Sequence, residues 1–552
     1  MHEKKLLPEK YYHTYYHHLL SVIESKYLGL LSDKELYYIE QFKNLSTDAQ
    51  CLYLRLQNRK GKYFRFSKFV YPEISYIQQR LQELIKKGFS ETVGPHEDEV
   101  EDILQLYTRG ELLSLLAYFD FPKRGLSTLY KAALVQYLAH NLPEQELWQI
   151  FREEPIIKQN FVDEALMLQF LYFGSLDMDM SQFVIRDIGN LKFEKVDESR
   201  LTATFENRQE AEDKLLMALA YKYFKALRNT ETPLDYFELL QTWLSNLPAL
   251  SLPAEPLLDR LIIRSGQFLE QARCPEEALL IYAKTKKAPA RERRVRILKK
   301  LGHNQEAVDL CLEIINAPEN ANEKYFAKDF IDKVGSGKRL VKSTTQFQKQ
   351  AEVISIDQAW QYNVEMGVLE WFEKKGMQGF FAENFIWRTL WGLLFWDIVF
   401  DEEHTGLHHP FQRSPDDLFT ENFLLLRAGA IQDRLGLLQQ AKKCKHYLKN
   451  TFQEKYGIVN PLIGWFEDLW PMLEYMLNKV PICKLEKTLL TMCKNLKDNS
   501  KGFPDLLVWD EQDYCFVEVK SPNDTLSAQQ LFWLEQFKEE GINAKLVNVK
   551  WK

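Results

Sequence analysis

Two carboxylates and a lysine near the end of the sequence are spaced so that they could bind a divalent metal ion and act on a phosphate ester. Asp505 begins one apolar run, and Glu518 and Lys520 end the next one. The polar segment 510–513 separates the two runs, which predicts an antiparallel hairpin. Such a hairpin would bring the three side chains together at one end.

The register of this hairpin follows from its loop. If Trp509 lies opposite Tyr514, then Asp505 lies opposite Glu518, where Cβ atoms are roughly 4.5–5.5 Å apart and like charges repel. A cation between the carboxylates would offset this repulsion, and their hard oxygens favour Mg²⁺ or Mn²⁺. A bound metal ion lowers the pKa of a bound water. Lys520 points to the same face as Glu518, where it could orient that water or stabilise the transition state.

The residues that flank these positions resemble a known nuclease family. Gly502-Phe503-Pro504-Asp505 and Glu518-Val519-Lys520 resemble the PD-(D/E)xK superfamily. The longer string, from Gly502 to Gln530 and Leu534, resembles the virus-type replication-repair (VRR) nuclease domain of the Fanconi-associated nucleases, in a bacterial form. The alternative is an ordinary hairpin with surface acids and a lysine. The resemblance implies a C-terminal α/β nuclease domain that hydrolyses DNA and leaves 5′-phosphate and 3′-hydroxyl ends.

The resemblance also implies a role for each residue of the site. The expected catalytic residues are Asp505, Glu518, Lys520 and Gln530. The expected metal ligands are Glu383, Asp505, Glu518 and the carbonyl of Val519, and the expected metal is Mg²⁺ or Mn²⁺. From helical periodicity alone, Glu383 is either a paired acid on an apolar helix face or a solvated acid at a helix end. Gln530 could instead bond backbone at the core edge, and the number of metal ions stays open.

Composition places the chain among globular proteins with several domains. Its 552 residues are enough for about three to five domains, and 45% of them are hydrophobic, which excludes a disordered chain. The seven cysteines have no Cys-x-x-Cys spacing and predict reduced thiols in a cytoplasmic protein. The most apolar stretch, 390–400, is too short to span a membrane. The net charge of −7 does not mark a nucleic-acid binder, although local basic patches can still bind phosphates.

We expect a multidomain, mostly α fold that ends in an α/β domain. The expected domains are an N-terminal helical or winged DNA-binding domain (1–98), a SAP-like module (99–145), TPR-like helical repeats (146–375) and a VRR nuclease domain (376–552). In the last domain, an apolar helix near 385–399 and a helical insertion over 400–500 should precede the hairpin. A helix over about 527–539 and a strand over 544–551 should follow it.

A basic segment in the N-terminal domain is a candidate DNA contact. A strand-like run over 62–70 interleaves Tyr63, Phe64 and Phe66 with cations. Cations among aromatic side chains suit a nucleic-acid backbone and its bases. The expected DNA-binding residues are Arg55, Arg59, Lys60, Lys62, Arg65 and Lys68. The alternative is a solvated hairpin edge protected by lysines.

Residues 100–142 have the pattern of two short helices around an extended segment, which resembles a SAP module. Ser127 could cap the second helix, whose first turn holds Lys131. Helix N-termini and nearby cations bind phosphates, so Lys123, Arg124 and Lys131 are the expected DNA contacts. An ordinary helical hairpin of this size is the alternative.

Two segments in the helical middle resemble each other and predict stacked repeats. Pro275–Tyr282 and Asn304–Cys311 each contain a Glu-Ala pair, with the alanines 29 positions apart (residue 278 to residue 307). This spacing is close to helix-pair repeat periods, and small alanines let stacked helices approach. A non-repeating helical bundle is the alternative.

A dense basic run separates these two segments. Residues 284–300 hold nine basic residues and one acid, Glu292. Solvated helix faces usually alternate in sign, and this run does not, which favours a phosphate-contacting face over a merely solvated one. The expected DNA contacts are Arg291, Arg293, Arg294 and Arg296.

The family resemblance implies a structure-selective enzyme that cuts near 5′ flaps of branched DNA, digests 5′→3′ and serves interstrand-crosslink repair. Animal members carry a ubiquitin-binding zinc finger, and the sequence has no cysteine–histidine cluster for one, so we expect no ubiquitin-directed recruitment. A bacterial, nucleoid-associated protein is expected, and no protein partner is predicted. The alternatives are a junction-resolving or restriction-type PD-(D/E)xK nuclease and a non-catalytic, DNA-binding TPR scaffold.

Overall fold

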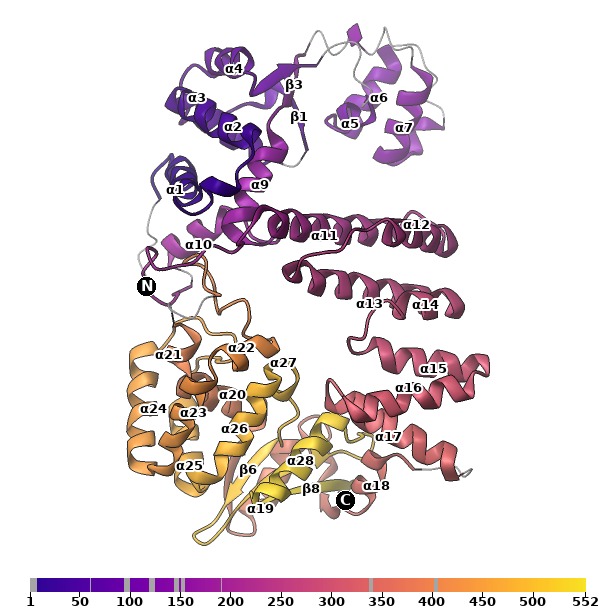
Figure 1. The fold of residues 1–552 in the computed structure, drawn as a ribbon, viewed down its shortest axis with the longest axis vertical. Helices are drawn as coiled ribbons and strands as arrows, with labels where there is room; N and C mark the ends of the chain where they lie inside the picture. Colours follow the sequence, from indigo (N-terminus) through magenta and orange to yellow (C-terminus); the bar gives the residue numbers. More distant parts are fainter. Residues whose placement is uncertain are drawn as a thin grey trace. The chain divides into compact units, whose positions relative to one another are not determined.

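The computed structural model describes residues 7–59, 61–93, 100–118, 125–142, 148–149, 154–189, 191–336, 341–401 and 406–552. The chain is mostly helical and divides into two compact units, residues 1–190 and 191–552 (Figure 1). No helix among the described residues is both long and apolar enough to cross a membrane. All the cysteines are free thiols, as their spacing predicted.

The N-terminal unit begins with helices that pack on a small antiparallel sheet. The first helices are α1 (Tyr11–Lys26), α2 (Asp33–Lys43), α3 (Thr47–Gln57) and α4 (Ile77–Lys86). The strands β1 (Tyr63–Arg65), β2 (Ser90–Thr92) and β3 (Ile156–Gln159) pair in the order β1-β3-β2. The strand predicted over 62–70 is therefore short, because a 3₁₀ turn over Phe66–Lys68 ends it. Tyr63 and Phe64 are buried rather than offered to bases.

A helical module interrupts this sheet, because it lies between β2 and the central strand β3. The module consists of α5 (Val100–Leu104), α6 (Arg109–Tyr118) and α7 (Lys131–Asn141) around buried leucines, and α9 (Val162–Phe173) and α10 (Ser181–Ile188) follow β3. Ser127 does not cap α7: the helix begins after Tyr130, and the carbonyl of Ser127 accepts a hydrogen bond from Arg109. The module has the expected helix–extended–helix order, and its SAP class stays a prediction.

The C-terminal unit opens with a stack of helices (Figure 1). These are α11 (Arg208–Leu227), α12 (Pro233–Ser245), α13 (Glu255–Gln271), α14 (Pro275–Tyr282), α15 (Ala290–Leu301), α16 (Asn304–Asn316) and α17 (Ala321–Ser336). The two similar segments are α14 and α16, and their alanines, Ala278 and Ala307, are fully buried between helices. Gly266 also permits close approach, since a Cβ there would lie 2.5 Å from the Tyr282 ring.

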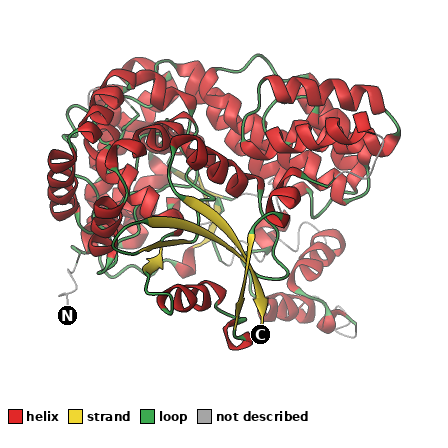
Figure 2. Ribbon diagram, turned by 90° about the horizontal axis from the view of Figure 1, so that it is seen from below, coloured by secondary structure: helices red, strands yellow, loops and turns green. Residues whose placement is uncertain are grey.

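A mixed sheet, whose strands are yellow in Figure 2, forms the centre of the C-terminal domain. Its strand order is β4-β8-β7-β6-β5. Its strands are β4 (Glu352–Ile356), β5 (Gln378–Phe381), β6 (Leu506–Trp509), β7 (Tyr514–Lys520) and β8 (Ala544–Trp551). Neighbours among β5, β6 and β7 are antiparallel, whereas β8 is parallel to both β7 and β4. The sheet thus includes β4, and α19 (Val364–Glu373) packs on it. Both elements precede the domain start expected at residue 376. β8 has the bounds that the sequence predicted.

Helices cover this sheet and complete its core. The predicted apolar helix is α20 (Glu383–Leu394) followed by α21 (Trp396–Val399), and the helix after the hairpin is α28 (Ala528–Glu540). The insertion contains α22 (Glu421–Leu426), α23 (Ala428–Gly436), α24 (Ala441–Lys455), α25 (Leu469–Lys479), α26 (Leu485–Lys494) and α27 (Leu496–Asn499). The insertion shares one core with α20 and the hairpin, in which Trp387, Trp391 and Trp533 are fully buried.

Candidate active site

The hairpin has the predicted register, with Leu507 opposite Phe516 and Trp509 opposite Tyr514. Asp505 lies immediately before β6 and is fixed from two directions. Its Oδ2 accepts a hydrogen bond from the backbone N–H of Val519 (2.8 Å), and its carbonyl accepts one from Ala382 (2.7 Å) and one from Glu383 (3.1 Å). The contacts tie β7 and the start of α20 to one aspartate.

The segment that leads to Asp505 is locked by aromatic packing. The Phe503 ring stacks between Trp387 of α20 and Trp533 of α28, with centroids 4.8 Å and 4.2 Å away. Gly502 has a φ of +81°, and a Cβ there would lie 2.7 Å from the Gln529 side chain. The glycine of the recognised string is therefore required by both backbone conformation and space.

Glu518 is fully buried, and only one of its two carboxylate oxygens has hydrogen-bond partners. Its Oε1 accepts from the Lys520 ammonium (2.7 Å) and from Nε2 of Gln530 (2.6 Å). Its Oε2 is buried with no hydrogen-bond partner. A buried carboxylate oxygen without a donor is costly, and a cation beside it would remove that cost. The donor set of Asp505 and Glu518 therefore fits a hard divalent metal ion.

The electrostatics of the site raise the pKa values of both acids. Burial and the nearby charge of Asp505 raise the pKa of Glu518 to about 8. Burial also raises the pKa of Asp505 to about 6, although the Val519 N–H and the Lys520 charge oppose this. Two acids with raised pKa values in one buried site are typical of functional centres.

Glu383 is the first residue of α20 and lies close enough for its charge to act on this pair, and its role as a metal ligand stays a prediction. Its negative charge contributes to the raised pKa of both Asp505 and Glu518. Its φ of +24° is a left-handed conformation that a non-glycine residue adopts only under constraint, and Nδ2 of Asn384 donates to its carboxylate (2.7 Å). In the described part of the chain, no three His, Cys, Asp or Glu side chains already converge closely enough to hold a metal ion.

Gln530 occupies a position that serves the helix and the site together. Ser527 caps α28 by accepting from the Gln530 N–H (3.2 Å), and Oε1 of Gln530 accepts from the Ser527 N–H (3.0 Å). This reciprocal capping box fixes the amide orientation. The amide nitrogen is then left to donate to Glu518, so the backbone bond and the site bond that sequence reasoning kept as alternatives both occur.

Glu365 is an acid near the site that sequence reasoning missed. It lies in the first turn of α19, and its charge also raises the pKa of Asp505. The domain boundary placed at residue 376 excluded it from consideration. Its position two residues after Asn363, at the start of an apolar helix, was the available signal.

A basic cavity that the sequence did not indicate is lined in part by α20, the helix that begins at Glu383. The cavity measures about 470 Å³ and is lined by Arg388, Lys497 and Lys501 together with Phe419, Pro461, Leu462 and Ser500. Nε of Arg388 donates to the carbonyl of Ser500 (2.7 Å), and burial lowers the pKa of Arg388. Lys501 is four residues before Asp505, so this cavity is close in sequence to one acid of the site.

Two arginines expected to contact DNA are held in ion pairs inside the N-terminal unit. Nε of Arg55 donates to Glu73 (2.7 Å). Arg65 bonds both Glu154 (2.6 Å) and Glu111 (2.8 Å), and its side chain is only 10% exposed. The Arg65 side chain is therefore largely enclosed, whereas the Arg55 side chain stays 31% exposed beside its acid.

The other cations of the first basic segment are less enclosed. Arg59 donates to the carbonyl of Lys68 (3.2 Å), and the Lys62 ammonium lies 5.2 Å from the centroid of the Tyr63 ring. Lys68 is exposed. Lys60 lies outside the described residues. These residues stay predicted DNA contacts.

In the helical module, Lys131 donates through its ammonium to the carbonyl of Gln105 (2.6 Å), a bond between α7 and the end of α5. Lys123 and Arg124 lie outside the described residues. The predicted phosphate contacts of this module therefore reduce, where the structure describes them, to a lysine that already has an internal partner.

The basic run on α15 is not one free face. Arg291 is 8% exposed and bonds Glu323 at 2.5 Å and the carbonyl of Ala317 at 3.0 Å. Arg293 pairs with Glu270 at 2.8 Å. Arg291 thus packs between helices with its charge paired to Glu323, and its role as a DNA contact stays a prediction.

The remaining two arginines of the run differ in exposure. Arg294 is half-buried, and burial lowers its pKa. Arg296 is exposed, pairs with Glu292 at 2.5 Å, and lies 4.6 Å from the centroid of the Phe326 ring. Arg296 is the member of the four whose charge faces solvent most.

Comparison with known proteins follows the same division of the chain. Residues 10–91 match the family model described as the FAN1 HTH domain, and residues 440–551 match the VRR-NUC domain. The chain is 27% identical to a Fanconi-associated nuclease 1 homolog of Pseudomonas aeruginosa over 99% of its own length and 97% of that protein. It is 24% identical to the Arabidopsis thaliana homolog over 94% of its length, and spans 65% of that relative.

Solved structures resemble the whole chain. Two crystal structures of paFAN1, bound to 5′-flap DNA with a gap and with flaps of one or two nucleotides, superpose with TM-scores of 0.85 and 0.84. Their sequences are 26% and 25% identical to this one, and both comparisons cover 99% of this chain.

Proposed function

The chain belongs to the Fanconi-associated nuclease family, and from this premise we propose that it is a structure-selective DNA endonuclease that cuts near the 5′ flap of branched DNA. We include 5′→3′ exonuclease activity and a role in interstrand-crosslink repair in a bacterial cytoplasm. The observation that carries the proposal is the buried pair of Asp505 and Glu518, with one carboxylate oxygen unsatisfied, in a chain similar along its whole length to a nuclease that is known bound to flap DNA.

We infer that Asp505, Glu518 and the carbonyl of Val519 would supply hard oxygen donors to a divalent metal ion, with Glu383 as a further ligand. The N–H of Val519 holds Asp505, and the charges of Asp505 and Glu383 both act on Glu518, which supports this set. Mg²⁺ and Mn²⁺ are the ions whose preferences suit such donors. A bound ion of this kind lowers the pKa of a coordinated water and neutralises charge on the phosphate.

The other side chains prepare the site for hydrolysis. Gln530 holds Glu518 in one orientation through an amide that its own helix cap fixes. Lys520 neutralises part of the Glu518 charge, and from the same face it can donate to a phosphate oxygen or orient the attacking water. The ring of Phe503, which stacks on Trp387 and Trp533, holds the segment before Asp505 in place.

The rest of the chain would recognise the branched substrate. We assign the N-terminal unit to DNA binding, with a SAP-like module inserted in its sheet, and the helices α11 to α17 to a TPR-like scaffold. The exposed cations Lys68 and Arg296 are the members of the predicted set best placed to meet phosphates. The nuclease domain then begins at β4 rather than at residue 376, because β4 is part of its sheet.

The test is cleavage of end-labelled 5′-flap, 3′-flap, four-way-junction and linear duplex DNA, with and without Mg²⁺ or Mn²⁺. We expect metal-dependent cutting near the 5′ flap and little on the other substrates. Asp505→Ala should lower the rate by at least roughly 100-fold while binding persists, since metal coordination contributes several kcal/mol of transition-state stabilisation.

The same panel separates the rival functions. Preferential cutting of four-way junctions, or of one duplex sequence, would replace the flap nuclease by a junction-resolving or restriction-type enzyme. Undiminished cutting by the Asp505→Ala protein would contradict the assigned site. Binding without cutting in either metal ion would leave a DNA-binding scaffold.

A further inference from the structure

Helix α24, in the insertion of the nuclease domain, has a basic face that the site described above does not use. Its buried side, Cys444, Leu448, Thr451 and Phe452, packs into the core. Lys442, Lys445, His446 and Lys449 share another side of the helix, because residues 442 and 449 each lie three or four positions from both residues 445 and 446. These four residues are named the α24 stripe.

The lysines of the α24 stripe make no ion pair within the described ranges, unlike Arg291, Arg293 and Arg296 of α15. Lys442 and Lys449 are exposed and make no ion pair within the described ranges. The Lys445 ammonium bonds a neutral amide, Asn478 of α25 (2.7 Å), and Nε2 of His446 bonds Asn450 (3.1 Å). Unneutralised cations aligned along a helix are a means of binding a polyanion.

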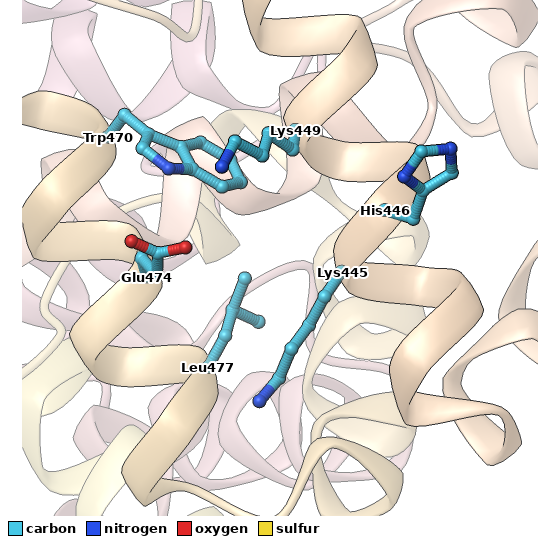
Figure 3. Close-up of a pocket in the computed structure, with 6 residues that line it drawn as sticks. All are labelled: Lys445, His446, Lys449, Trp470, Glu474 and Leu477. Atoms are coloured by element: carbon cyan, nitrogen blue, oxygen red, sulfur yellow. The ribbon is translucent and has the colours of Figure 1, made fainter.

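A small cavity of about 110 Å³ lies beside the stripe, between α24 and α25. Figure 3 shows Lys445, His446 and Lys449 on one helix, and Trp470, Glu474 and Leu477 on the facing one. The indole N–H of Trp470 is buried and has no hydrogen-bond partner. No ion pair among the described residues joins Glu474 to the lysines across the cavity, so both the indole donor and the ammonium groups remain able to meet an acceptor.

We propose that the α24 stripe, with Trp470 beside it, binds the phosphate backbone of the DNA. Lys442 and Lys449 are seven residues apart, which is about 10.5 Å along a helix, and that span is about the rise of three base-pair steps along a duplex axis. The indole N–H supplies a neutral donor to a phosphate oxygen at the side of the stripe. This inference rests on the proposed function, because it takes DNA as the substrate.

The experiment measures binding of a labelled 5′-flap duplex by fluorescence anisotropy in EDTA, where no strand is cut, over a series of salt concentrations. Each lysine that neutralises a phosphate contributes about 0.9 to the slope of log K against log salt. We therefore expect the Lys442→Ala, Lys449→Ala protein to lose about 1.8 from that slope and roughly eightfold in affinity per lysine in 0.1 M salt.

A matched control removes two exposed lysines elsewhere in the same domain, Lys487→Ala and Lys538→Ala on α26 and α28. This control should leave the slope unchanged. Melting temperatures of both proteins check that the fold is intact. An unchanged slope in the Lys442→Ala, Lys449→Ala protein would overturn the proposal. The proposal would also be overturned if this protein bound DNA as tightly as the wild type but bound anionic lipid vesicles less tightly.

A substitution in the opposite direction makes the test independent of folding defects. Glu474→Gln removes a negative charge from the cavity and should tighten flap binding by a few-fold, because a carboxylate there repels the phosphate. Weaker or equal binding would contradict a phosphate ligand. If the wild-type protein binds and cuts flaps while all these variants behave alike, the stripe fails and the proposed function stands.

Discussion

At the scale of single residues, the burial of Glu518 raises its pKa and makes the stability of the fold depend on pH. Its ordinary pKa of 4.5 is raised to about 8 by burial and by Asp505. Between these values the folded protein binds a proton that the unfolded chain has released. The free energy of unfolding therefore falls as the pH rises through this window and is regained toward acidic pH.

We predict that the metal-free protein melts at a lower temperature at about pH 9 than at about pH 6, and that Glu518→Gln reduces this difference. Mn²⁺ should raise the melting temperature more at the higher pH, because the carboxylates must lose their protons to bind it. Calorimetry in EDTA and in Mn²⁺ checks both trends. Equal pH dependence in the wild type and in Glu518→Gln would show that Glu518 does not carry the proton.

Gln530 permits a separation of stability from positioning. Ser527→Ala and Gln530→Ala each break the capping box of α28 and should each cost about 1 kcal/mol of folding free energy. Only Gln530→Ala also removes the donor to Glu518, and a hydrogen bond to a charged group contributes about 1.5–3 kcal/mol.

The cutting rate at saturating metal should therefore fall by at least roughly tenfold in Gln530→Ala and stay near the wild-type rate in Ser527→Ala. Rates and melting curves of both variants check this expectation. If the two proteins lose activity equally, Gln530 acts only as a helix cap.

At the scale of elements, the turn before Asp505 controls where the acid stands. Gly502 and Gly457 share a φ of +81°, but only Gly502 faces a crowded neighbour. Alanine at either position should cost about 1–2 kcal/mol for the left-handed backbone. At Gly502 the contact with Gln529 should add about 1–3 kcal/mol.

Gly457→Ala is thus a matched control for Gly502→Ala. We expect Gly502→Ala to be the less stable of the two in urea unfolding and the one that loses metal-dependent cutting, because Phe503 and Asp505 must shift with it. Equal unfolding midpoints would mean that the Gln529 side chain moves aside at no cost.

The sequence could predict the elements whose cues are local. A polar loop between apolar runs set the register of β6 and β7, and the glutamine at the start of α28 faces the site. β4 and β5 were missed because each is short and pairs with a strand far along the chain. Arg65 and Arg291 were misread because Glu154 and Glu323, which neutralise them, are distant in sequence and close only after folding.

At the scale of the whole molecule, the chain forms two compact units, residues 1–190 and 191–552. Residues 191–552 contain their own core, the sheet and every residue of the candidate site. We predict that a fragment of these residues folds and keeps Mn²⁺-dependent cutting of single-stranded DNA, while its preference for 5′ flaps over linear duplex falls toward one. Parallel rate measurements on single-stranded DNA, 5′-flap DNA and linear duplex check this. Full flap preference in the fragment would place recognition outside the N-terminal unit.

The order of strands in the nuclease sheet has a consequence for synthesis. β8 lies between β7, which carries Glu518, and β4, so an interior position of the sheet is filled by residues 544–551. When β4, β6 and β7 have left the ribosome but β8 has not, the sheet lacks the strand that joins β4 to β7. We therefore expect Glu518 to gain a fixed position only after residues 544–551 have been synthesised and β8 has paired with β7.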